Sequence, residues 1–523
     1  MVASCKRAYA VWLIVLITSV CLGPVFSGAD AAPPGAKGPE AKAPKLKISE
    51  KSLGKLGWGP YAFSPDYRHI AYATRQGKKD IVVIDGVKGK EYDNIDIWSI
   101  VFSPDSKRVA YLAQDGLNWL VVSDGVAGKA YDSLEDTKVI FSPDSQRLAY
   151  YAKRGWKWVA VVNGAEGQEY DAIKEGTLMF SPDSRRVAFC AMRDGKWVVN
   201  VDGVEGKEYD GIVEGSLMFS ADSKRVAYGG WREGKYVVTV DGIEGKEYDG
   251  IKKSLTFSPD SQRVAYLAER DGKSFVVVDG VEGKEYDGNN YHSLLAFSPD
   301  SKRVAYVAER GQNAYVVVDG VDGKEYGGIM EGPIFSPDSQ RVAYFATRDG
   351  KGVVVVDGLE SKPYDRIVGD SMGSIFSPDS KRVAFAAGRN GKWVVVADDL
   401  EGKLFDDTDD YFTRLVFSPD SKRLVYVVRH RGMGVTVVEG DEVKEYAEIL
   451  DGPMFSSDSK HVAYVVQGEG RGRFVVIDGS EGKEYDNLVD IEEAKLVFDS
   501  PTRLHTLAAR GIEIFLVEIE IVE

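Results

Sequence analysis

The sequence predicts an all-β protein made of repeated four-stranded sheets, and three observations support this. The run FSPDSKRVAY at Phe102–Tyr111 occurs in twelve copies, which begin at intervals of 38 to 43 residues between Phe63 and Phe498. Tight-turn residues punctuate every copy. No copy shows the spacing of apolar residues that an amphipathic helix needs. A repeat of this length predicts an array of equivalent units, each packed on its neighbours.

Residues 216–251 show how one repeat predicts four strands. The apolar run Ser216–Ser220 is the first strand, and a Ser-x-Asp-Ser turn follows it. Arg225–Gly229 begins the second strand, because its β-branched and aromatic residues favour a pleat. The sequence Glu-Gly-Lys then predicts a hairpin to the third strand, Tyr236–Val240. An Asp-Gly turn leads to the fourth strand, Lys246–Tyr248, and a variable loop leads to the next copy.

The third and fourth strands indicate how the sheets are arranged. Third strands are almost wholly apolar, as in YVVVD at Tyr315 and FVVVD at Phe275, so both faces of each sheet should be covered. Fourth strands read KEYD and are charged, which suits an outer edge. Sheets stacked face to face around an axis, with the polar strand outermost, form a β-propeller. We therefore predict twelve four-stranded blades of about 40 residues.

Twelve blades exceed the four to eight that one ring usually holds. We therefore predict two six-bladed rings, residues 49–290 and 291–523, divided near Gly288–His292. The twelfth copy ends after its third strand, Ile512–Val522. Leu46–Ser52, ahead of the first copy, could supply the missing fourth strand and close a ring. The alternative is a last blade of three strands.

The first 31 residues resemble a signal peptide. Lys6 and Arg7 precede the apolar stretch Ala10–Gly23, and Ala29–Ala31 fits a cleavage site. We predict an exported protein, periplasmic or secreted, with no integral membrane segment in the mature chain. Residues 32–48 are rich in Pro, Ala and Lys and predict a tether. Val20 does not suit a lipobox, so we do not expect a lipid anchor at Cys21.

Charge and composition restrict the choice of ligands. The net charge of −15 argues against a nucleic-acid surface, which requires a basic field. Cys190 is the single cysteine beyond the predicted signal peptide, and its apolar neighbours suggest a buried side chain. The five histidines show no paired metal-binding motif. We predict no cofactor and no metal.

The run FSPDSKRVAY and its copies closely resemble the PD40, or WD40-like, repeat of TolB-type propellers. The resemblance covers nearly all of residues 63–523. It implies an exported propeller that binds other proteins. TolB itself carries an α/β domain ahead of its propeller, and this chain has only the tether there. A place in the Tol–Pal envelope system therefore does not follow from the resemblance.

The loops between blades vary most among the copies, whereas the SPDS and DGVEGK turns barely change. In a propeller these loops share one face with the hairpins between the second and third strands. Repeated turns serve the scaffold, and varied loops can serve recognition. We therefore predict a binding surface on that face. The candidate residues are Trp98, Tyr291, His292, Asp409, Asp410 and Tyr411.

Two other motifs in these loops suggest chemistry but lack its context. The residues 369–373 match the G-x-S-x-G nucleophile elbow, which needs a strand–turn–helix setting that is not predicted here. The acidic run 406–410 lacks the spacing of a known calcium loop. We read both as exposed loops.

The leading function hypothesis is a non-catalytic scaffold that binds a protein or peptide. The first alternative is a propeller enzyme of the lyase, lactonase or glycosidase type, with its residues gathered at the ring axis. Spacing in a sequence cannot reveal such a site. The second alternative is a glycan-binding protein that uses exposed Trp and Tyr side chains, with Trp158, Trp197 and Trp393 as a possible row.

Overall fold

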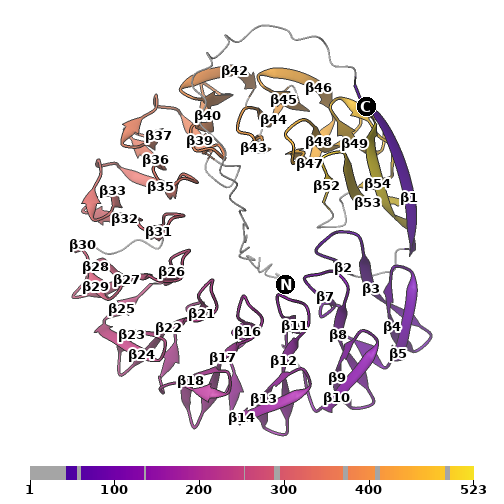
Figure 1. The fold of residues 1–523 in the computed structure, drawn as a ribbon, viewed down its shortest axis with the longest axis vertical. Helices are drawn as coiled ribbons and strands as arrows, with labels where there is room; N and C mark the ends of the chain where they lie inside the picture. Colours follow the sequence, from indigo (N-terminus) through magenta and orange to yellow (C-terminus); the bar gives the residue numbers. More distant parts are fainter. Residues whose placement is uncertain are drawn as a thin grey trace, which may run out of the picture. The chain divides into compact units, whose positions relative to one another are not determined.

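The computed structural model describes residues 43–55, 60–134, 137–252, 254–287, 295–368, 375–406, 413–430, 432–488 and 495–522. Every regular element in these ranges is a β-strand, and the strands form twelve antiparallel sheets. The sheets follow one another around a ring with an open centre (Figure 1). The fold is a twelve-bladed β-propeller, which confirms the predicted fold class and number of blades.

The fifth blade shows the common pattern. The short strands β20 (Gly211–Ile212) and β21 (Met218–Phe219) are innermost and pair with β22 (Val226–Arg232). β23 (Lys235–Val240) comes next, and β24 (Ile243–Tyr248) is outermost. The third strand is buried in the middle of the sheet, whereas the fourth is exposed except at Glu244, which is half-buried, and Tyr248, which is buried. The apolar and charged runs of the sequence therefore predicted the order of the strands correctly.

The two central strands recur in every blade. The second strands are β3 (Ile70–Gln76), β8 (Val109–Asp115), β12 (Leu148–Arg154), β17 (Val187–Arg193), β22, β27 (Val264–Arg270), β32 (Val304–Arg310), β36 (Val342–Arg348), β40 (Ala384–Arg389), β44 (Leu424–His430), β48 (Val462–Gln467) and β53 (Arg503–Arg510). The third strands are β4 (Lys79–Ile84), β9 (Asn118–Ser123), β13 (Lys157–Val162), β18 (Lys196–Val201), β23, β28 (Lys273–Val278), β33 (Asn313–Val318), β37 (Lys351–Val356), β41 (Lys392–Ala397), β45 (Met433–Val438), β49 (Arg473–Ile477) and β54 (Glu513–Val522).

The SPDS turns join consecutive blades. In the second blade, the backbone N–H of Asp105 donates to Ser145 Oγ of the next blade at 2.9 Å. Arg108 donates to the carbonyl of Ser145 at 2.9 Å and lies over the ring of Phe141. The second Ser of the turn has a positive φ, as at Ser145 (65°), which aims its hydroxyl at the preceding blade. The signature run is therefore a connector between blades as well as a turn within one.

The expectation of two six-bladed rings is wrong, because the same connection crosses the predicted boundary. The N–H of Asp260 in the sixth blade donates to Ser301 Oγ in the seventh at 2.9 Å. The twelfth blade returns to the first, where His505 Nε2 lies 2.7 Å from the carbonyl of Asp66. Residues 43–523 form one compact unit. The same Asp-to-Ser bond recurs from blade to blade, so the described junctions are alike, and the ring closes where β1 joins the twelfth blade.

The N-terminal strand closes this ring, as the sequence suggested. β1 (Lys45–Lys55) pairs antiparallel with β54 over its whole length and is the fourth strand of the twelfth blade. The strand begins at Lys45, so the last residues of the predicted tether belong to the fold. Residues 1–42, with the predicted signal peptide and most of the tether, lie outside the described residues.

The core lies between blades. At the junction of the fifth and sixth blades, Tyr248 packs edge-on against Tyr266 and Phe275, and Val238 and Val277 complete the cluster. Cys190 is buried in the next junction back, and burial raises the pKa of its thiol to about 12. A thiol with this pKa stays protonated at neutral pH, so Cys190 acts as a small apolar residue.

Candidate functional site

The interblade loops and the second-to-third-strand hairpins share one face of the ring, here called the loop face. Asp93 ends the first blade just after β5 (Val87–Tyr92), and its carboxylate accepts the backbone N–H of Gly116 at 2.8 Å. Gly116 is in the hairpin turn of the second blade. Hydrogen bonds from Lys79 and Gly116 lower the pKa of Asp93. Asp132, Asp171 and Asp210 repeat this contact in later blades, so each loop is held beside the next hairpin.

Two kinds of two-residue hairpin turn occur on the loop face. In the fourth blade the turn is Asp194-Gly195, and both residues have positive φ, at 51° and 79°. In the second and third blades the turn is Gly116-Leu117 and Gly155-Trp156, and only the glycine has positive φ. The second kind leaves room for a side chain at the tip. The tips there carry Leu117 and Trp156, and each is 89% exposed.

Trp98 lies in a comparable position on the loop after β6 (Asn94–Ile95). The turn is closed by the N–H of Ser99 on the carbonyl of Asp96 at 3.1 Å. The equivalent position in the fourth and fifth blades is held by Gly176 and Gly215. Trp98 is 79% exposed and its N–H donates to Asp96 Oδ1 at 3.0 Å. A large indole thus stands where the fourth and fifth blades have no side chain.

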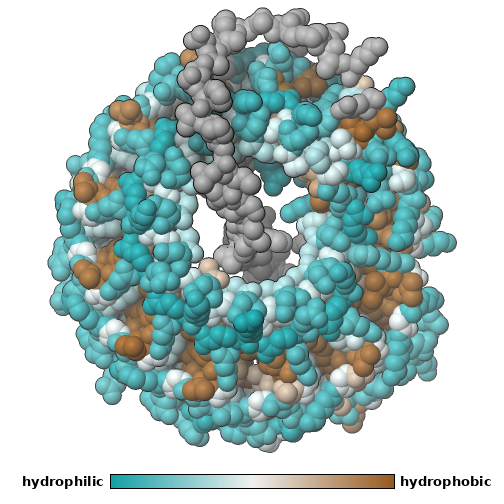
Figure 2. Space-filling view, viewed as in Figure 1, coloured by the Kyte–Doolittle hydropathy of each residue, from teal (hydrophilic) through white to brown (hydrophobic). Residues whose placement is uncertain are grey.

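We call Trp98, Leu117 and Trp156 the sector patch, since they come from adjacent blades on one face. They differ from the apolar residues that the repeat exposes regularly at the start of the fourth strand, which are Val87, Val126, Val204, Ile243, Val281, Val321, Leu359 and Leu400. Figure 2 shows apolar side chains spaced around the outer circumference. A feature present in nearly every blade belongs to the scaffold, whereas the sector patch is a local departure from it.

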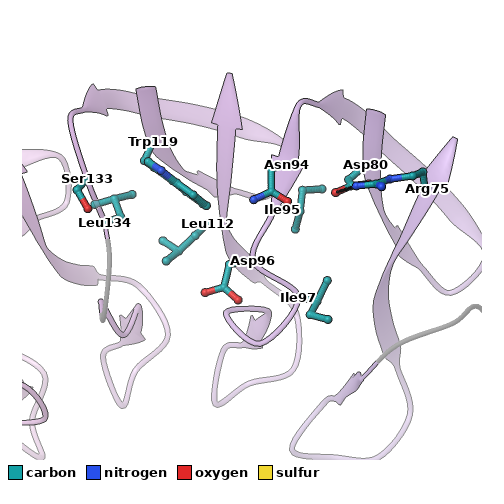
Figure 3. Close-up of a pocket in the computed structure, with 10 residues that line it drawn as sticks. All are labelled: Arg75, Asp80, Asn94, Ile95, Asp96, Ile97, Leu112, Trp119, Ser133 and Leu134. Carbon is teal, nitrogen blue, oxygen red and sulfur yellow. Dashed lines mark hydrogen bonds and ion pairs between the residues drawn. The ribbon is translucent and has the colours of Figure 1, made fainter. Parts of the chain in front are cut away.

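A cavity of about 700 Å³ lies beside the sector patch, between the first three blades. It is lined by Arg75, Asp80, Asn94, Ile95, Asp96, Ile97, Leu112, Trp119, Ser133 and Leu134. In Figure 3, Asp96 lies between the side chains of Leu112 and Ile97, and Trp119 lies toward Ser133 and Leu134. The volume is in the range of small-ligand and peptide-anchor pockets.

The two carboxylates that line this cavity differ in their hydrogen bonds. Asp80 is 8% exposed, and both of its oxygens accept hydrogen bonds from Arg75, at 2.8 and 3.3 Å. Asp96 uses Oδ1 for the turn at Trp98. The cavity therefore combines an apolar wall with one compensated carboxylate and one that faces the open space. This arrangement can bind a ligand that carries both an apolar surface and hydrogen-bond donors.

Of the six residues predicted for binding, Trp98 lies on the loop face as expected. The other five, Tyr291, His292, Asp409, Asp410 and Tyr411, fall outside the described residues, as do residues 369–373. Sequence reasoning did not identify Leu117, Trp156 or the cavity. The replacement of the usual Asp-Gly by Gly-Leu and Gly-Trp in these two hairpins was the available signal.

The structure also shows the surroundings of two histidines in the repeat and of the tryptophans on the third strands. His69 and His461 replace the connector Arg, and each contacts the aspartate that Arg would bind, Asp85 and Asp478, at 2.6 Å. They keep the contact that Arg makes in the other blades and are structural. Trp158 packs edge-on against Tyr151, and Trp393 is only 5% exposed. Trp158 and Trp197 are half-buried in neighbouring blades, whereas Trp393 is buried in the ninth, so the three do not form one continuous row.

The comparisons with known proteins agree with this architecture. The family model described as the TolB beta propeller domain, PD40, matches residues 279–490. Over these residues, which are less than half of the chain, the β-propeller resembles the TolB propeller domain with its PD40 repeats. The matched stretch covers the last turn and fourth strand of the sixth blade and the whole of the next five. No curated protein matches the sequence of this chain.

Solved structures resemble the chain at low identity. A eukaryotic initiation factor structure has 13% identity and a TM-score of 0.33, and the match covers 73% of this chain and 96% of that one. TolB from Acinetobacter baumannii has 16% identity and a TM-score of 0.22, with 49% and 77% covered. Within the described residues, no helix is long and apolar enough to cross a membrane, and no cluster of three metal-binding side chains occurs.

Proposed function

We propose that this protein is an exported, non-catalytic scaffold that binds a protein or peptide on its loop face. One observation carries the proposal: in a ring of near-identical blades, large exposed apolar side chains replace glycine at three adjacent loop-face positions, Trp98, Leu117 and Trp156. Exposed aromatic residues beside a pocket are typical of binding hot spots. They are exposed and are not needed for the turn, since Gly176 and Gly215 hold the place of Trp98 and Gly195 holds the hairpin tip in the fourth blade.

The export part of the proposal rests on residues 1–31 and on the likeness to TolB-type propellers, which suggests the periplasm. The non-catalytic part rests on the recurrence of nearly the same strands and turns in the described blades. An enzyme with its site at the axis and a glycan-binding protein are the competing functions, and both are outcomes of the test below.

The test is a capture experiment with residues 32–523 as bait, using envelope and secreted extracts, with partners identified by mass spectrometry. The variant Trp98→Ala/Leu117→Ala/Trp156→Ala removes the sector patch. The matched control is Gln312→Ala/Met330→Ala, on exposed positions of the seventh and eighth blades. A partner retained by the control and lost by the patch variant supports the proposal. Retention on glycans, turnover of a substrate, or equal loss in both variants contradicts it.

A further inference from the structure

We propose that the cavity between the first three blades binds a lysine or arginine side chain of an extended peptide. The inference rests on the proposed function and specifies its ligand. The apolar wall contacts the aliphatic stem, and Asp96 binds the cationic head. The remainder of the peptide lies across Trp98 toward the hairpin tips of the second and third blades.

The wall of the cavity suits a long aliphatic stem. Ile95, Leu112 and Leu134 are buried, and they contribute apolar lining next to the indole of Trp119. Lysine and arginine bury their methylene groups along apolar surfaces while the charge stays at a polar end. Aromatic side chains add a cation–π attraction when a cation approaches a ring face. The same wall would also accept leucine or methionine, so the polar end of the cavity decides the selectivity.

The polar end favours a cation. Arg75 already neutralises Asp80, with hydrogen bonds to both of its carboxylate oxygens. Lys79, the neighbour of Asp80 in the sequence, pairs with Asp93. The hydrogen bonds described for the Asp96 carboxylate involve Oδ1 only, and the donor is the N–H of Trp98. Asp96 therefore leaves one oxygen for a ligand and gives the cavity a net charge of about −1 from its three charged side chains.

A peptide fits these observations better than a glycan or a free amino acid. The sector patch extends over the second and third blades, so the ligand must be longer than one residue to contact both the cavity and Trp156. Leu117, at a hairpin tip, offers an aliphatic contact that suits a peptide side chain and gives no stacking surface to a sugar ring. The net charge of −15 attracts a basic segment at low ionic strength and accelerates its association.

The test uses a phage library of random heptapeptides selected on residues 32–523, followed by calorimetry on the best synthetic peptide. We expect enrichment of a single Lys or Arg between apolar residues. The variant Asp96→Asn keeps an oxygen for the Trp98 N–H and removes the charge, and it should weaken the peptide by about tenfold. The matched control, Asp115→Asn on the same blade but outside the cavity lining, should change affinity by less than about twofold.

A peptide in which Gln replaces the basic residue completes the design. It should bind weakly and should not distinguish the native chain from Asp96→Asn. Enriched peptides without a basic residue, or equal binding by both chains, would overturn this inference and leave the proposed function standing. A different outcome would count against the proposed function itself. In that outcome no peptide is selected, or every selected peptide binds the triple variant Trp98→Ala/Leu117→Ala/Trp156→Ala as well as it binds the native chain.

Discussion

The outer edge of the ring differs between the fourth to ninth blades and the first two. In the fifth blade, Glu244 on the fourth strand accepts hydrogen bonds from Arg232 of its own blade, at 3.0 Å, and from Lys207 and Tyr209 of the preceding blade, at 2.7 and 2.9 Å. The same set recurs around Glu205, Glu282, Asp322, Glu360 and Glu401, with small variations. Each such acid joins two blades.

The first two blades lack this contact. Lys88 takes the place of the acid in the first blade and donates to Gln76 at 2.9 Å. Ala127 takes its place in the second, where Asp115 stands at the position of the arginine. Tyr92, fully buried, has no hydrogen-bond partner for its hydroxyl among the described residues. These two blades also border the cavity, so the scaffold pattern relaxes where the candidate site lies.

The twelfth blade keeps the contact through the N-terminal strand. Glu50 of β1 accepts hydrogen bonds from Lys483 and Tyr485 of the eleventh blade and from Arg510 of the twelfth, at 3.0, 2.6 and 3.0 Å. The strand that closes the ring thus supplies the same acid as a fourth strand in the middle of the chain. The comparison indicates that closure depends on β1, whereas the first two blades are joined mainly by their apolar core.

Removal of β1 should lower the stability of the ring more than substitution of any one residue of this strand, because β1 closes the twelfth blade. A variant that begins at residue 60 loses the outer strand of the twelfth blade and exposes one whole edge of β54. We expect thermal unfolding to begin at least about 10 °C lower and to lose cooperativity, because the ring can open at this junction. Hydrogen exchange should show loss of protection first in β53 and β54. Unchanged protection there would contradict the role of β1 in closure.

Truncation of Leu53 should have the next largest effect on stability. Leu53 is 1% exposed and packs with Ile70 of the first blade and Leu507 and Ile514 of the twelfth. Leu53→Ala should lower the free energy of unfolding by about 3 kcal/mol, since it removes buried methyl groups and leaves a cavity. Leu400→Ala, at an exposed position, is the control and should change it by less than about 0.5 kcal/mol in urea titrations.

Glu50 makes the closure sensitive to acid. Burial opposes ionisation, but hydrogen bonds from Tyr485, Lys483 and Arg510 outweigh it and lower the pKa of Glu50 from 4.5 to about 2. Since the folded pKa is lower, the stabilisation is complete above about pH 4.5 and is lost as pH falls toward 2. Glu50→Gln should cost on the order of 2 kcal/mol at pH 7, and the cost should shrink at pH 2.5. An equal cost at both pH values would refute this.

Restoring the repeat pattern between the first two blades should give the smallest effect. The double variant Asp115→Arg/Ala127→Glu recreates the acid and arginine beside Lys90 and Tyr92. We expect a gain of about 1 kcal/mol in the free energy of unfolding, because a buried hydroxyl obtains a partner and a charged cluster forms. Ala127→Glu alone should gain less, since the new carboxylate would lie near Asp115. A free energy of unfolding that is higher for Ala127→Glu than for Asp115→Arg/Ala127→Glu would contradict this account of the first two blades.

Much of this fold could be predicted from local sequence. The apolar third strands and the charged KEYD strands indicated the order of strands in each blade, and the missing last strand indicated the role of residues 46–52. Trp98 could be nominated because its loop differs from the others. Leu117 and Trp156 were missed because their loops are short hairpins, which looked like scaffold until the turn conformations were compared.

The sequence by itself determined the repeat and its four strands, because these depend on patterns within about 40 residues, and it offered residues 46–52 as one of two ways to end the twelfth blade. Only the tertiary structure decided that twelve blades form one ring, since that follows from the angle at which neighbouring sheets pack. It also decided that Asp96, Trp119 and Asp80, from two different blades, line one cavity. Contacts between blades arise from packing geometry, and no single repeat carries that information.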